Sequence, residues 1–425
     1  MEELPDSLDE TYERMLREIR KPNQGHARRM LQCLVAAIRP LRVAELAEIL
    51  AIDFNVAGTP KLNPGWRWDD HEEAVMSTCS SLVMIVDDKD KSGGAGKVED
   101  SRIVQFSHFS VKEFLMSDRL AESSREIAVS QYHIQLEPAH AILTQACLGV
   151  LLRLDDRINR DNIKGFPLAS YAAQYWDDHA RFGNVSSAIK DEMECLFDPD
   201  KPHFSAWLWI YNKDLGGNSM STVSPEKPEG VPLYYAARFG FRDLTAHLLA
   251  EYPDDVRVRG GSFVTPLHAS AARGYLDVCS LLLDHFPNPD IPEGRYNQTV
   301  LHLISHEGHL EIGKYLLHRG ADIDAQERDG WTPLYIAVLC GQLEFARMLL
   351  ERGAAVHTPD HIGQTPLHVA SREGFVQAVR LLLEHGADLH VRNHDGRTPS
   401  EVASIHRKRD IVQLLSDYTA MPEKE

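Results

Sequence analysis

The sequence predicts a mainly α-helical protein that ends in a solenoid of about six repeats. The first supporting observation is a motif of the Thr-Pro-Leu-His type, which returns in steps of 34, 34, 33, 33 and 33 residues. The second is a glycine that keeps nearly the same step along the same stretch. The third is the apolar periodicity of the N-terminal half, which is helical except for one strand–loop–strand pattern. A fixed period of this length is the signature of a repeat array.

Residues 1–120 combine helices with one β-hairpin pattern. Apolar residues at helical spacing predict helices over 12–19, 30–38 and 43–50. Two β-branched runs, 82–86 and 103–106, predict strands joined by a loop rich in Gly, Lys and Asp. Helices followed by a hairpin with a long loop are typical of a winged-helix domain.

Residues 121–215 are again helical in pattern, and we interpret them as a helical spacer. Their main segments are 139–154, 166–180 and 185–197. Residues 216–230 hold Gly, Ser, Pro and Asn and predict a linker. The repeats then occupy residues 231–420.

The residue pattern of each repeat predicts two short antiparallel helices. Thr can cap the first helix and Pro suits its first turn. Gly341 separates the helices of one copy, and Asp329-Gly330 is a turn dipeptide at the tip before the next Thr-Pro. The last copy has Arg407 where glycine is expected, and its polar replacements fit a terminal cap. Period and motif together resemble ankyrin repeats, which present a long binding surface and no closed reaction pocket.

Four strings in the N-terminal half resemble a known arrangement. They are LPDSLDETY at 4–12, RPL at 39–41 leading into ELA at 45–47, VQFSHFSVKEFL at 104–115, and YAAQYW at 171–176 with His179 after it. Together they are similar to the winged-helix and helical region of fungal NACHT–ankyrin proteins, which are NLR-like. That region is often labelled a GPI inositol-deacylase winged helix. The resemblance implies the order NACHT NTPase, winged helix, spacer and ankyrin sensor, with this chain beginning where the NTPase would end.

Composition excludes several classes of function. The formal charge is −18, divided as −11 over residues 1–200 and −7 over 201–425, so direct nucleic-acid binding is not expected. The one compact basic run, Arg407-Lys408-Arg409, is interpreted as a solvated helix face. No apolar run is long enough to span a membrane, and no signal peptide is recognisable. Six scattered cysteines indicate reduced core residues, which favours the cytoplasm, with the nucleus as the alternative.

No motif predicts catalysis, a cofactor, a metal or a small-molecule substrate. Gly93–Lys97 lacks the first glycine and the final Ser or Thr of a phosphate loop. No G-x-S-x-G nucleophile motif exists. His302, His306 and His309 have metal-like spacing, but we interpret His302 as the repeat's own turn-holding histidine. His108 beside Ser107 and Ser110 is not expected to form a catalytic pair, because adjacent residues rarely converge.

The sequence therefore predicts a protein partner, bound on the concave face and the finger tips of the array. The finger is the extended segment that precedes each Thr-Pro start, and its tip is the turn that holds Asp329-Gly330 in one copy. Trp331 is the sharpest candidate as an interface anchor, although packing on a neighbouring finger is equally compatible with the sequence. The full set of candidates at tip and inner-helix positions is Arg238, Arg273, Glu307, Glu327, Arg328, Trp331, Leu339, His361, Gln364, Arg372, Arg392, Asn393, His394 and Arg397.

We expect a non-enzymatic interaction scaffold or regulator from an NLR-like lineage. The alternative is a nuclear transcription coregulator that acts through a DNA-binding partner. Direct DNA reading by the winged helix is not expected, because the helix over 43–50 carries Glu45 and Glu48 where a DNA reader needs Arg or Lys.

Overall fold

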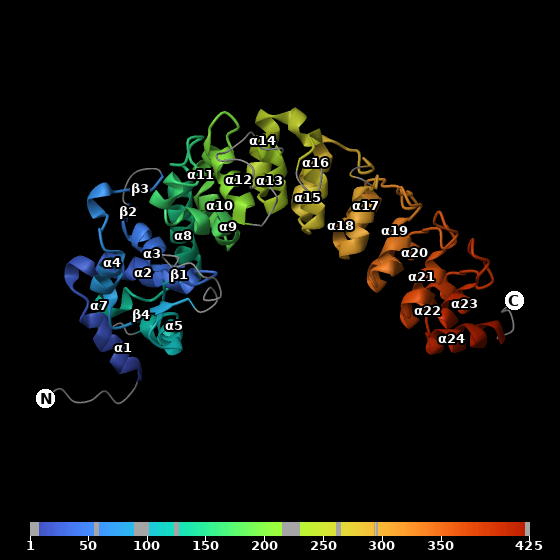
Figure 1. Cartoon of the computed structure of the whole chain (residues 1–425), viewed down its shortest axis with the longest axis horizontal. Coiled ribbons are helices and arrows are strands. Elements are labelled where there is room, and N and C mark those ends of the chain that lie inside the picture. Colours follow the sequence, from blue (N-terminus) through green and yellow to red (C-terminus); the bar gives the residue numbers. More distant parts are fainter. Residues whose placement is uncertain are drawn as a thin grey trace. The chain divides into compact units, whose positions relative to one another are not determined.

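The computed structural model describes residues 8–54, 59–88, 102–122, 127–214, 230–260, 265–292, 294 and 296–420 (Figure 1). The chain divides into two compact units, Met1–Pro228 and Glu229–Glu425. Residues 4–7, the Gly93–Lys97 segment and residues 216–229 of the expected linker lie outside the described residues.

The N-terminal unit contains a winged-helix fold, as the sequence predicts. Its three-stranded sheet has the order β1-β5-β4, and β4 pairs antiparallel with β5 so that Val83 lies opposite Phe106. The bounds are α2 (Gln24–Ala36), β1 (Leu41–Arg42), α3 (Val43–Leu50), α4 (His71–Cys79), β4 (Val83–Asp87) and β5 (Arg102–Phe106). Helix α2 begins earlier than the apolar pattern suggested, because its first turn is polar.

Shorter elements surround this fold. They are α1 (Leu8–Arg17), η1 (Lys21–Asn23), β2 (Ile52–Asp53), β3 (Lys61–Leu62), η2 (Pro64–Trp66), α5 (Phe109–Leu115), α6 (Asp118–Glu122), α7 (Ile127–Ser130) and η4 (Asn162–Gly165). Strands β2 and β3 form a second, two-stranded sheet.

The helical spacer belongs to the same compact unit as the winged helix. Its long apolar helix α8 packs against both α2 and α9, and Leu143, Ala146 and Cys147 of α8 are fully buried. Trp176 and Trp207 meet edge to face at 5.6 Å inside the spacer. The spacer helices are α8 (Leu136–Leu151), α9 (Ala169–Ala180), α10 (Val185–Ala188), α11 (Lys190–Leu196) and α12 (His203–Asp214).

The C-terminal unit is a stack of helix pairs, which confirms the repeat solenoid (Figure 1). Each inner helix packs on the inner helix of the next repeat, and each outer helix packs on the next outer helix. In the described residues the pairs are α13 (Pro232–Phe239) with α14 (Arg242–Glu251), α15 (Pro266–Ala272) with α16 (Leu276–His285), α17 (Val300–Glu307) with α18 (Leu310–His318), α19 (Pro333–Leu339) with α20 (Leu343–Glu351), α21 (Pro366–Glu373) with α22 (Val376–Glu384), and α23 (Pro399–Ile405) with α24 (Arg409–Ala420). A 3₁₀ turn, η5 (Pro253–Arg257), follows α14.

The turn between the two helices of a repeat adopts a left-handed conformation that favours glycine. Gly308 and Gly374 close α17 and α21 with φ of 82° and 86°, a region that suits glycine. A side chain from the next repeat covers each of these turns: Gln342 lies over Gly308, and Lys408 lies over Gly374. In the last repeat the turn residue is Arg407, and it adopts the same left-handed conformation with φ of 60°.

Candidate protein-interaction surface

The histidine of the Thr-Pro-Leu-His motif ties two of the repeats to the repeat that follows. His302 Nδ1 lies 2.8 Å from Thr299 Oγ1, and its Nε2 lies 3.0 Å from the carbonyl oxygen of Trp331. His368 repeats both contacts with Thr365 and Arg397. Since a carbonyl only accepts, Nε2 carries the proton. The backbone N–H groups of Thr299 and Thr365 donate to Nδ1 of these rings, each at 3.2 Å, so Nδ1 carries no proton and both rings are neutral. Burial lowers the pKa of both rings, which keeps them in that neutral form.

Tyr335 replaces this histidine in the fourth repeat. Its hydroxyl donates to Asp360 Oδ2 at 2.7 Å, so the tie to the next finger is kept through a different acceptor. Burial raises the pKa of the Tyr335 hydroxyl, and the neighbouring Asp360 raises it further, so the donor proton stays in place.

A buried acceptor anchors the turn at each finger tip of the last three repeats. Glu327 Oε1 accepts from the backbone N–H groups of Asp329 and Trp331, at 2.7 and 3.3 Å. Asp360 makes the same pair of contacts in the next finger, and Asn393 Oδ1 accepts from Asp395 and Arg397 at 3.1 and 2.9 Å. These polar side chains thus accept from backbone N–H groups that the turns alone leave unsatisfied.

The prediction that Glu327 and Asn393 are contact residues at the tips is therefore wrong. Glu327 is 4% exposed and Asn393 is 6% exposed, because both point into their own turns. Their carboxylate and amide oxygens are occupied by backbone donors. They shape the tips and are not presented to a partner.

The tips are joined to one another by backbone hydrogen bonds. The N–H of Arg328 donates to the Tyr296 carbonyl at 2.7 Å, and the N–H of His394 donates to the Ile362 carbonyl at 3.0 Å. His361 makes the corresponding bond to Asp329 at 3.1 Å. The Arg328, His361 and His394 side chains are exposed at equivalent positions on successive fingers. We call these three residues the tip row.

The other predicted contact residues divide into exposed and half-buried sets. Besides the tip row, Arg273, Glu307, Arg392 and Arg397 are exposed, whereas Arg238, Trp331, Leu339, Gln364 and Arg372 are half-buried. The Trp331 indole stacks on Tyr335 of its own repeat, with ring centroids 5.3 Å apart and planes 16° apart. Arg372 is held by Glu373 at 2.8 Å and by Gln364 at 3.2 Å.

Sequence reasoning missed two exposed apolar side chains at the tips. Tyr296 is 46% exposed and Ile362 is 57% exposed. They stand at the position where Asp329 and Asp395 stand in the other fingers. The sequence did contain a signal for them, because a large apolar residue stands where the other fingers have a turn-forming aspartate.

The described residues hold no group of three or more metal-ligating side chains. His302, His306 and His309 do not converge: His309 Nε2 contacts the carbonyl of Ala272 at 3.1 Å, whereas His306 lies against Glu307. His108 and Ser110 do converge, contrary to expectation, with Nδ1 and Oγ 2.6 Å apart. There the ring caps α5 by accepting from the Ser110 N–H.

The winged helix differs from the sequence interpretation at α3. Every residue of α3 is buried, and Arg39 holds Glu45 through two contacts of 2.8 and 2.6 Å. Glu48 accepts from the backbone N–H of Leu168 at 2.7 Å. These glutamates are therefore structural and are no guide to DNA binding.

Helix α4 is the second helix of the packed α3–α4 pair, the place of a DNA-reading helix in helix-turn-helix proteins. Its first turn is acidic, with Asp70 as N-cap and Glu72 and Glu73 behind it. Glu72 forms an ion pair with Arg102. Carboxylates at this end of the helix repel a phosphate backbone.

Comparison with known proteins supports both parts of the fold. Residues 233–327, 288–360 and 356–425 match the family described as ankyrin repeats. Residues 12–130 match the family described as the GPI inositol-deacylase, winged helix domain. Together the matches define a repeat protein with an N-terminal winged-helix domain.

One relative is a protein of Monascus ruber described as "Azaphilone pigments biosynthesis cluster protein L". It is 31% identical to this chain over 260 residues, which make up 58% of this chain and 51% of the relative. The chain thus spans about half the length of that relative. Among the described helices, none combines the length and apolar character needed to cross a bilayer.

Proposed function

We propose that this protein is a non-enzymatic scaffold or regulator that binds a protein partner along the finger tips and the concave face of its repeats. The observation that carries the proposal is the tip row: Arg328, His361 and His394 are exposed on fingers whose backbones are joined by hydrogen bonds. A surface ordered in this way loses little conformational entropy on binding.

The apolar side chains at the tips supply the second part of the surface. Ile362 is exposed next to His361 in the sequence, and Trp331 is half-buried, with its indole stacked on Tyr335. Interfaces commonly place aromatic and arginine side chains at their energetic centre. We therefore propose that the partner contacts the fingers from Arg328 to Arg397.

The NLR-like lineage is part of the proposal, supported by the winged-helix match and the four N-terminal strings. The alternative is a coregulator in the nucleus that works through a DNA-binding protein. The acidic first turn of α4 favours such an indirect route over direct DNA contact. The relative's description as a protein of a pigment biosynthesis cluster is compatible with a regulatory role in either compartment.

The test is quantitative affinity capture with mass spectrometry from cells of the source organism. The full chain is compared with a variant carrying Trp331→Ala, Arg328→Glu, Arg392→Glu and Arg397→Glu. A matched control carries Lys314→Glu, Arg347→Glu and Arg380→Glu, which reverse three charges on the outer helices α18, α20 and α22.

We expect the tip variant to capture at least tenfold less of the partner than the control variant does. Loss of a transcription factor supports the coregulator, and loss of a NACHT protein or a cytosolic target supports the scaffold. Partners that stay bound to the tip variant place the function in residues 1–215 and contradict the proposal. Turnover of ATP by the pure chain contradicts its non-enzymatic part.

A further inference from the structure

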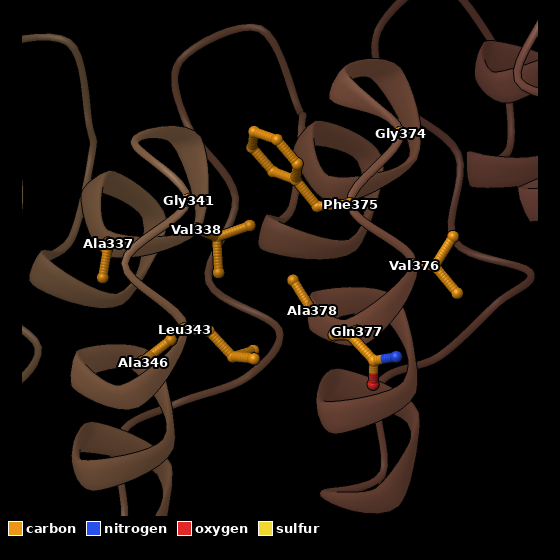
Figure 2. Close-up of a pocket in the computed structure, with 10 residues that line it drawn as sticks. All are labelled: Ala337, Val338, Gly341, Leu343, Ala346, Gly374, Phe375, Val376, Gln377 and Ala378. Carbon is orange, nitrogen blue, oxygen red and sulfur yellow. The ribbon is translucent and has the colours of Figure 1, made fainter.

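A second surface lies between the fourth and fifth repeats, at the end of the helices remote from the finger tips. A cavity of about 410 Å³ opens there, within the size range of ligand pockets. Figure 2 shows Val338 and Leu343 of one repeat facing Phe375 and Ala378 of the next. Gln377 is the one polar side chain among the ten residues that line it. We call this feature the 343/375 groove.

The groove exists because the fifth repeat lacks a large side chain at one position. In the preceding pair of repeats, Phe345 packs directly over Gly313, so that a Cβ at Gly313 would lie 2.7 Å from the ring. The residues at the same positions one repeat later are Ala378 and Ala346. Two small side chains leave unfilled the space that the phenyl ring occupies in the other interface.

The apolar walls of the groove are partly exposed to solvent. Phe375 is 37% exposed, and Leu343 and Val376 are half-buried. Burying such surface on binding is favourable, at about 25 cal/mol for each Å² removed from water.

A cationic rim borders the groove. The Lys408 side chain crosses Gly374, which lines the groove, with Nζ 3.2 Å from the position of a Cβ on that glycine. Arg407 and Arg409 flank it and are exposed. In the part of the chain that the structure describes, none of these three side chains forms an ion pair. Together with Asp410, the run 407–410 carries three positive charges and one negative charge in a chain of net charge −18.

We propose that the 343/375 groove and its cationic rim bind an acidic, apolar peptide segment of a partner protein. One large apolar side chain enters between Leu343 and Phe375, and a neighbouring carboxylate lies beside Lys408. Charge complementarity selects the acidic segment, because an unpaired local cation in an acidic protein attracts anions and repels basic partners. The open groove lets a peptide backbone cross outside while its side chain enters.

This surface is independent of the tip row. The tips stand at the start of each inner helix, whereas the groove is lined by the turns and outer-helix starts at Gly341 and Gly374. The two surfaces can therefore be tested separately, and either can fail alone.

The test is fluorescence anisotropy of the full chain with a labelled peptide of sequence EDLFDE. Two control peptides, EDSSDE and KKLFKK, remove the apolar residues or reverse the charge. Ala378→Phe fills the groove, and the smaller Ala378→Val fills it in part. Lys408→Glu reverses the rim, and Lys314→Glu is the charge-matched control on α18. Circular dichroism of each variant establishes that the repeats remain folded.

We expect EDLFDE to bind at least tenfold more tightly than either control peptide. Ala378→Phe and Lys408→Glu each weaken it at least tenfold, Ala378→Val weakens it less, and Lys314→Glu leaves it unchanged. No binding of EDLFDE at millimolar concentration overturns the proposal. So does binding that responds to Lys408→Glu and ignores both Ala378 variants, since that reports surface charge alone. If a labelled fatty acid binds at the groove more tightly than EDLFDE, the groove is a site for a small amphiphile and the proposal of a peptide ligand is wrong.

Discussion

At the scale of single residues, one position has the same structural role in successive repeats although its side chain changes. Glu327, Asp360 and Asn393 stand 33 residues apart, and all three bury their oxygens against backbone N–H groups of the tip turn. Their side chains differ in charge, so the requirement is for an acceptor of suitable reach. The residues next to them in the sequence are exposed. Charge alone therefore does not separate a contact residue from a structural one.

Asn393→Ala should destabilise the C-terminal repeats by about 1–2 kcal/mol. The change removes the acceptor of the Asp395 and Arg397 N–H groups, and losing the partner of a part-buried donor carries a cost of that order. Arg397→Ala is the matched control, because its side chain is exposed and its backbone contact is retained. Urea unfolding measures both; equal midpoints would show that Asn393 is not a turn anchor.

Arg407→Gly should stabilise the last repeat by about 1 kcal/mol. Arg407 has φ of 60°, a left-handed conformation that costs a residue with a Cβ about 1–2 kcal/mol. Gly374→Ala tests the opposite change, since its φ is 86° and a Cβ would meet Lys408 at 2.8 Å. Pulsed hydrogen exchange of peptides from 399–420 reports the first change. Faster opening in Arg407→Gly would contradict the argument.

At the scale of elements, stability is shared between neighbours. Leu334 of α19 is fully buried, and α19 packs on both α17 and α21. Leu334→Ala should cost about 2–4 kcal/mol, because a cavity opens in this shared interface. Hydrogen exchange should rise in the third and fifth repeats as well as in the fourth. A rise confined to residues 320–353 would mean that the repeats are not energetically coupled.

The elements with strong periodicity were predictable from the sequence, and the weakly periodic ones were not. The repeat helices follow from the Thr-Pro start and the glycine turn, and α3 was predicted at 43–50 as it stands. Helix α4 was missed because only part of its short length is apolar, although Asp70 caps it by accepting from Glu72 and Glu73. The full burial of α3 was also missed, since two of its eight residues are glutamates whose partners are distant in sequence.

For the candidate site, the sequence could place the tips but could not tell which side chains face outward. Arg328 and His394 are exposed as predicted, whereas their neighbours Glu327 and Asn393 turn inward. Adjacent residues in a tight turn point in opposite directions, and the direction depends on the turn's hydrogen bonds. The 343/375 groove likewise depends on which small residues meet across an interface, which no single repeat reveals.

At the scale of the whole molecule, the repeat histidines should make the array sensitive to acid. Burial lowers the pKa of His268 to about 4, and it also lowers the pKa of His302 and His368. The unfolded chain binds a proton at each near pH 6.5 while the folded chain does not. The free energy of unfolding therefore falls as pH drops below about 6.5, by up to about 1.4 kcal/mol per pH unit for each histidine.

His368→Tyr should reduce this pH dependence, because tyrosine stays neutral throughout the range and Tyr335 already fills the same position in the neighbouring repeat. His318→Gln, which changes an exposed histidine, is the control and should leave the slope as it is. Urea midpoints at pH 7.5, 5.5 and 4.5, read by pulsed hydrogen exchange over 265–397, give the slope. The slope and not the absolute stability is decisive, since the new hydroxyl also changes the contact with the next finger. An unchanged slope in His368→Tyr would show that this ring takes up its proton without unfolding, and the neutral Nε2–H tie to the Arg397 carbonyl would then be dispensable.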